Sequence, residues 1–112
     1  MRLDVAAGSG VAVLLQCTTD AWVRARRVVD LSVAGVGIVL EPSVSLPLHQ
    51  HTRVTLVLGA AGAGGRGGQV TAIARTARVM DDGGVRYGME FVDVPRALSL
   101  AIERHLASPA PR

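Results

Sequence analysis

The residues best suited to polar chemistry interrupt the most apolar stretch of the sequence, RVVDLSVAGVGIVL at residues 27–40. Asp30, Ser32 and Gly35 lie there among β-branched and aliphatic side chains. Aspartate and serine accept hydrogen bonds from nearby backbone N–H groups, whereas glycine permits a positive φ or a close approach to the backbone. The spacing D-x-S-x-x-G therefore predicts a tight turn between two strands. Two interpretations follow, a structural turn without a ligand or a small polar site at a barrel edge, and the spacing alone favours the first.

The elements that must position this turn are short strands followed by one helix. Turn residues, alternation and β-branched residues predict strands at residues 11–17, 21–30, 35–40, 52–59, 69–80 and 85–94. The DDGG sequence at 81–84 predicts a hairpin turn, and the prolines of 41–50 predict a loop. Apolar residues take a helical spacing at 95–106. This order predicts an all-β fold, a small barrel or sandwich, with one C-terminal α-helix.

Alternation along the strands and the period of the helix predict which side chains face the core. The strand at 52–59 places Val54, Leu56 and Leu58 on one side. The helix at 95–106 has an apolar stripe that must cover the barrel or a partner protein. This stripe consists of Leu98, Ala101, Ile102, His105 and Leu106.

The composition indicates a single domain in a reducing compartment. A chain of 112 residues is long enough for one hydrophobic core. Its one cysteine, Cys17, cannot form an internal disulfide. Residues 1–17 do not fit a secretion signal. No run of the sequence approaches the roughly 20 apolar residues that span a bilayer. We therefore expect a cytoplasmic protein without membrane insertion. It should have a flexible N-terminal arm at 1–10, a folded domain at 11–107 and a disordered tail at 108–112.

Two further patterns could carry chemistry, and neither predicts an enzyme. The tract GAAGAGGRGG at 59–68 matches G-x-G-x-x-G, but a lone motif in a glycine-rich run is weak, and too few residues follow it to complete a doubly wound sheet. It predicts a flexible hairpin loop with Arg66 at its tip. His49 and His51 form H-x-H without a carboxylate or cysteine cluster, so we expect no metal or cofactor. No histidine is expected near Cys17 to activate it as a nucleophile.

The segment RVVDLSVAGVGI resembles the D/N-x-S-x-x-G motif of PilZ domains. The segments LPLHQHTRVTLVL, TAIARTARVM and RYGMEFVDV follow in the order typical of that family, so that the resemblance covers residues 11–106. It implies a six-stranded antiparallel β-barrel with a C-terminal helix, and cyclic di-GMP as a ligand. Asp30 and Ser32 would then bond guanine edges, and Gly35 would form the turn that lets the ligand close in.

The sequence departs from the family at a second motif, R-x-x-x-R on the arm before the first strand. It contains no such pair, because Ala6 stands four residues after Arg2. Each lost charge-assisted hydrogen bond removes about 1.5–3 kcal/mol, or tenfold or more in affinity. The missing pair could be replaced by Arg24, Arg26 and Arg27, which lie close to the motif in the sequence. The interpretation that we favour is that these three are ordinary exposed strand residues.

We therefore expect a non-enzymatic bacterial signalling module, a regulatory adaptor with weak or absent cyclic di-GMP binding. The alternative is a functional receptor that uses Arg2, Arg24, Arg26 or Arg27 in place of the missing pair. The expected partner is a protein of a signalling, motility or secretion pathway, and the oligomeric state stays open. A net charge of +3 without a clustered basic stripe disfavours nucleic acid.

Overall fold

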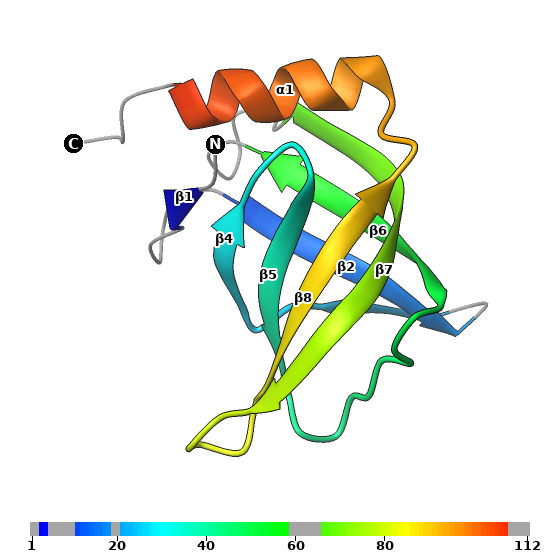
Figure 1. Cartoon of the computed structure of the whole chain (residues 1–112), viewed down its shortest axis with the longest axis vertical. Helices are drawn as coiled ribbons and strands as arrows, with labels where there is room; N and C mark the ends of the chain where they lie inside the picture. The colour runs from blue at the N-terminus through cyan, green and yellow to red at the C-terminus, as the bar shows by residue number, and fades with distance from the viewer. Residues whose placement is uncertain (1–2, 5–10, 19–20, 59–65, 108–112) are drawn as a thin grey trace.

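The computed structural model describes residues 3–4, 11–18, 21–58 and 66–107, which form a curled β-sheet with one helix lying across its end (Figure 1). The helix is α1 (Arg96–Ala107). The strands are β1 (Leu3–Asp4), β2 (Val11–Thr18), β3 (Ala21–Arg24), β4 (Arg27–Leu31), β5 (Gly35–Leu40), β6 (His51–Leu58), β7 (Arg66–Val79) and β8 (Val85–Val92). The predicted fold class, mostly β with one C-terminal helix, is confirmed.

The order of strands in the sheet is β1-β4-β5-β8-β7-β6-β2-β3, and every named pair is antiparallel. Although β3 and β4 belong to opposite ends of this order, only Ala25 and Arg26 separate them in the chain. The Ala25 amide donates to the Val13 carbonyl of β2 at 2.8 Å, and the Arg26 amide donates to the Val39 carbonyl of β5 at 2.9 Å. The chain thus passes from one end of the sheet to the other at these two residues, which closes the barrel.

This crossing corrects one prediction, because residues 21–30 are two strands and not one. Alternation does not reveal the break, since Ala25 is buried between the exposed residues Arg24 and Arg26 as in a regular strand. When β3 and β4 are taken as one bent strand, the predicted six strands all occur. The short β1 is additional, and it pairs Leu3 with Leu31.

The core follows the predicted alternation and lies inside the curled sheet. Val54, Leu56 and Leu58 of β6 are all buried, as expected. Leu98 and Ile102 are the most deeply buried residues of α1, which packs on β6 and β7 and covers one end of the barrel (Figure 1). In the described residues, no helix is both long and apolar enough to cross a membrane.

The structure can be compared with the predictions for two loops, the β7–β8 turn and the connection between β6 and β7. The hairpin turn between β7 and β8 is confirmed: Gly83 has a φ of 90°, and the Met80 amide donates to the Gly84 carbonyl at 2.7 Å. Arg66 does not lie at the tip of a loop as predicted, because it begins β7 and pairs with Leu58. The glycine tract therefore leads into a strand and not into a helix. The rest of that loop, at 59–65, lies outside the described residues.

The predicted arm and tail also lie outside the described residues, apart from the two residues of β1. Nothing in the structure tests the predictions for 1–2, 5–10 or 108–112, or for Arg2.

Candidate ligand site on the outer face of the barrel

The turn between β4 and β5 is built by Ser32, which is buried with 7% of its surface exposed. Its amide donates to the Gly35 carbonyl at 2.9 Å, and its hydroxyl accepts a hydrogen bond from the Ala34 amide at 3.2 Å. The hydroxyl also lies 3.5 Å from the Gly35 carbonyl, to which it donates. The serine of the motif thus satisfies the backbone of its own turn.

Gly35 is required by a close approach and not by its φ, which lies outside the left-handed region. A Cβ added to Gly35 would clash with the carbonyl oxygen of Met89 on β8. Just before it, the Ala34 carbonyl accepts a hydrogen bond from the Phe91 amide at 2.8 Å. The glycine therefore lets the turn lie directly against β8.

Asp30 faces outward because β4 contains a bulge. The register shifts between Val28, which pairs with Ile38, and Asp30, which pairs with Gly37. Val28 and Leu31 are both buried in the core, so regular alternation could not place both of them inward. The extra residue of the bulge turns Asp30 onto the outer face of the sheet.

A row of four residues crosses the outer face from β4 to β7. Asp30 pairs with Gly37, Gly37 with Gly88, and Gly88 with Thr76. A Cβ on Gly37 would lie 2.7 Å from Asp30 Oδ1, and a Cβ on Gly88 would lie 2.6 Å from Thr76 Oγ1. The two glycines therefore let the flanking polar side chains lie flat over the sheet, and they form a shallow trough.

The adjacent row of the same face carries three arginines. Arg27 pairs with Val39, Val39 with Arg86, and Arg86 with Arg78. The Arg86 guanidinium lies 3.7 Å from the carboxylate of Asp30, whose side chain is only 6% exposed. Arg27 and Arg78 are exposed, and neither forms an ion pair with another described residue. The face beside the trough is therefore positively charged.

Two pockets lie over this face. The first has a volume of about 260 Å³ and is lined by Asp30, Val36, Gly37, Thr76, Arg78, Arg86 and Gly88. The second has a volume of about 400 Å³ and is lined by Ala34, Gly35, Arg75, Thr76, Gly88, Met89 and Glu90. The two pockets are adjacent, because Thr76 and Gly88 line both, and we refer to them together as the groove between the carboxylate of Asp30 and the turn at Gly35.

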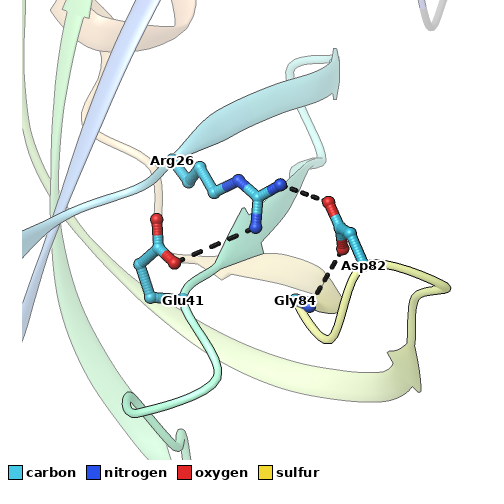
Figure 2. A network of polar contacts seen from close by, with 4 residues as sticks. All are labelled: Arg26, Glu41, Asp82 and Gly84. Atoms are coloured by element: carbon cyan, nitrogen blue, oxygen red, sulfur yellow. Dashed lines mark hydrogen bonds and ion pairs between the residues drawn. The ribbon is translucent and has the colours of Figure 1, made fainter.

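Arg26, one of the predicted substitutes for the missing arginine pair, lies in a different network (Figure 2). Its guanidinium forms an ion pair with Asp82 in the β7–β8 turn, and a second with Glu41 at 3.9 Å. Asp82 also accepts a hydrogen bond from the Gly84 amide at 3.0 Å. This backbone hydrogen bond, followed by the one from Arg26, lowers the pKa of Asp82. The network ties the end of the hairpin to the strand crossing at Ala25 and Arg26.

The other predicted substitutes are divided between two parts of the barrel. Arg24 is exposed on β3, where it pairs with Leu14 of β2, and β3 lies at the opposite end of the sheet order from β4. Arg27 lies on the outer face, in the row that also contains Arg86. The structure thus brings Asp30 and Arg27 to one face and leaves Arg24 outside it.

Sequence reasoning missed Arg78 and Arg86. Period two predicts that Arg86 points away from the core, because it alternates with Val85 and Tyr87. Arg78 and Arg86 also pair close to the predicted hairpin turn, on the turn side of the bulge between Ala74 and Thr76, so their pairing could have been counted from that turn.

The two histidines of the H-x-H pattern lie at the start of β6 and in the loop before it. His51, on β6, lines a separate pocket of about 430 Å³ with Arg53 and Asp93. His49 is exposed and has a φ of 62°. Among the residues that the structure describes, no group of three or more His, Cys, Asp or Glu could hold a metal ion.

The comparisons with known proteins agree with this architecture. The PilZ domain family model matches residues 9–108. An inhibitor of motility from Bacillus subtilis (MotI/DgrA) is 18% identical with a TM-score of 0.70, and the match covers 94% of this chain and 49% of that one. YcgR from Escherichia coli, solved in complex with cyclic di-GMP, is 17% identical with a TM-score of 0.69, and the match covers 95% and 42%.

The isolated PilZ domain of YcgR, solved with cyclic di-GMP, is 16% identical with a TM-score of 0.66, and the match covers 93% of this chain and 84% of that one. No curated protein matches significantly. The chain spans about half the length of the first two solved structures. At these identities the structural likeness establishes the fold alone.

Proposed function

The chain belongs to the PilZ domain family, and we propose that it is a non-enzymatic regulatory adaptor of bacterial signalling that binds cyclic di-GMP weakly. The observation that carries this proposal is the groove on the outer face, which runs from Asp30 to the turn of Ser32 and Gly35. Among the described residues that line the groove there is no paired nucleophile and base, which supports a binding role over catalysis.

The chemistry of the groove fits a guanine nucleotide. An ionised aspartate only accepts hydrogen bonds, and a guanine presents N–H donors along one edge. Asp30 places such an acceptor over the buried Gly37 of β5 and in the same pocket as Gly88 of β8, a half-buried glycine that has no side chain to keep a flat ring from the strand. The family resemblance assigns contacts with guanine edges to Asp30 and Ser32, and to Gly35 the turn that lets the ligand close in. Two of the similar structures contain cyclic di-GMP.

Three features support weak binding. The sequence lacks the R-x-x-x-R pair, and each lost charge-assisted hydrogen bond costs about 1.5–3 kcal/mol. The guanidinium of Arg26 is already paired with Asp82 and Glu41. The hydroxyl of Ser32 is bonded within its own turn, so it would have to share these bonds with a ligand.

The adaptor role completes the proposal. Signal output then requires a protein partner of a signalling, motility or secretion pathway, and the similarity to an inhibitor of motility supports a motility partner. The single cysteine supports a reducing compartment such as the bacterial cytoplasm.

Calorimetric titration of the purified protein with cyclic di-GMP tests the ligand. We expect saturable binding in the range of tens of micromolar or weaker, about −7 kcal/mol or less favourable. A dissociation constant of about 1 μM or tighter would contradict the weak binding proposed here. No heat at millimolar ligand from a folded protein would remove cyclic di-GMP from the proposal. The adaptor role would then be tested by whether deletion of the gene alters motility and whether the wild-type chain restores it.

A further inference from the structure

We infer that Arg78 on β7 and Arg86 on β8 bind the phosphate groups of cyclic di-GMP, in place of the arginine pair that this sequence lacks. The inference rests on the proposed function, because it assigns contacts to the same ligand in the same groove. It differs from the sequence-based alternative, in which Arg2, Arg24, Arg26 or Arg27 would supply the missing charges.

The guanidinium groups of these two arginines repel each other. Arg78 and Arg86 are direct partners in the β7–β8 register and lie on one face, where like charges opposite each other are destabilising. Arg86 has the carboxylate of Asp30 at 3.7 Å, but Arg78 forms no ion pair with any described residue. A phosphodiester between the two guanidinium groups would relieve this repulsion, and arginine presents donors in the fork geometry that phosphate oxygens accept.

Both arginines also line the same pocket as Asp30. The 260 Å³ pocket contains two cations and one carboxylate, so its net charge is positive. It therefore offers an acceptor for a guanine edge and donors for a phosphate within one cavity. A ligand that carries both groups, as a cyclic dinucleotide does, matches this combination better than a purely anionic or a purely neutral ligand.

The size of the pocket also bears on its occupant. A volume of 260 Å³ is below the roughly 300–1,000 Å³ of typical small-molecule sites. The groove reaches that range only when the adjoining 400 Å³ pocket is included, across Thr76 and Gly88. An occupant of the whole groove must therefore lie over the glycine trough. Phosphates at Arg78 and Arg86 and a flat ring over Gly88 satisfy this condition.

The remaining arginines near the groove form ion pairs, line another pocket or, in the case of Arg27, lie on the same face without lining either pocket of the groove. Arg75 lines the larger pocket but forms an ion pair with Glu90 at 3.4 Å. Arg26 is paired with Asp82 and Glu41. Arg53 lines a different pocket, with His51 and Asp93. In the part of the chain that the structure describes, Arg78 and Arg86 are thus the cations that face both Asp30 and the trough.

Calorimetric titration with cyclic di-GMP should be repeated on Arg78→Gln, Arg86→Gln and Arg53→Gln. We expect the first two to weaken binding about tenfold or more each, since each removes charge-assisted contacts to a phosphate. Arg53→Gln is the matched control, because it makes the same charge change on an exposed residue of the same sheet, outside the groove. It should change the affinity less than twofold. Arg78→Lys should fall between wild type and Arg78→Gln, because lysine keeps the charge and loses the fork.

The outcomes separate this inference from the proposed function. Arg86→Gln removes the cation beside the buried Asp30 and could lower folding yield, so Arg78→Gln, at an exposed residue without an ion pair in the described chain, decides the test. If wild type binds and Arg78→Gln binds equally well, the inference is wrong and the proposed function stands. If all three glutamine variants weaken binding equally, the effect is one of net charge, and the inference is also wrong. If wild type binds nothing, the ligand itself is wrong and both fail.

Discussion

Asp30 and Arg86 form an ion pair that passes over a third strand. Asp30 belongs to β4 and Arg86 to β8, yet Oδ2 and Nη2 are 3.7 Å apart because Gly37 of β5, which lies between them, has no side chain. The bulge in β4 turns the carboxylate outward, and the glycine lets it reach across. The motif residue Asp30 is thus held in position by Arg86 of β8, a strand that contains no residue of the motif.

Gly37→Ala should disturb this arrangement. The added Cβ would lie 2.7 Å from Asp30 Oδ1, so the carboxylate must move and its ion pair with Arg86 must weaken. We expect a loss of about 1–3 kcal/mol in the free energy of unfolding, measured by urea denaturation. Gly68→Ala on β7 is the control, since its Cβ would meet only Leu98 at 3.9 Å, an ordinary contact. Equal stabilities for the two variants would contradict the proposed position of Asp30.

Gly35→Ala should be more damaging than Gly37→Ala. At Gly35 the added Cβ would clash with the backbone carbonyl of Met89, which cannot swing away as the side chain of Asp30 can. The turn would have to separate from β8, where the Ala34 carbonyl accepts from the Phe91 amide. We expect a loss of more than about 3 kcal/mol or a failure to fold. Urea midpoints and soluble yield compare the two variants, and a Gly35→Ala protein as stable as wild type would be inconsistent with the close approach.

The sequence predicted the elements of this fold well, because their signals are local. Alternation identified the core side of β6 from Val54, Leu56 and Leu58, and the helical period identified the face of α1. The sequence pattern could not locate the crossing at Ala25 and Arg26, because the amides of these residues donate hydrogen bonds to strands that are distant in sequence.

The same limit applies to the candidate site. Asp30, Ser32 and Gly35 form a local motif and could be found from their spacing. Arg78 and Arg86 pair beside the predicted β7–β8 turn, but they join the motif only through the register of four strands, and the bulge in β4 shifts the position of Asp30 by an amount that the sequence does not show. The ion pair of Arg26 with Asp82 could not be predicted either, because 56 positions separate these residues in the sequence and only the fold brings them together.

Arg26→Gln tests whether this residue serves the barrel or the ligand. Because its guanidinium is paired with Asp82 and Glu41 and is partly exposed, we expect a loss of at most about 1 kcal/mol in stability. The affinity for cyclic di-GMP should stay within about twofold of wild type, measured by calorimetry beside Arg78→Gln. Loss of ligand binding in Arg26→Gln, with the fold intact, would instead favour the receptor alternative in which Arg26 replaces the missing pair.

Asp82 gives the network in Figure 2 a pH dependence. Hydrogen bonds from the Gly84 amide and then from Arg26 hold the pKa of Asp82 below its ordinary value of 3.8. A carboxylate with a lowered folded-state pKa contributes stability that is present above the unfolded-state pKa and is lost as the pH falls through the folded-state pKa. The stability difference between wild type and Asp82→Asn should therefore be constant near neutral pH and should shrink as the pH falls below about 3.8.

Thermal unfolding midpoints of wild type and Asp82→Asn between pH 7 and pH 2 would measure this difference. Asp81→Asn provides the matched control, because Asp81 is an exposed neighbour in the same turn and its side chain forms no hydrogen bond or ion pair with another described residue. Its midpoint should follow that of wild type at every pH. A difference between wild type and Asp82→Asn that stays the same down to pH 2 would mean that the Asp82 carboxylate is not held by Gly84 and Arg26, and the β7–β8 turn would then be fastened by other contacts.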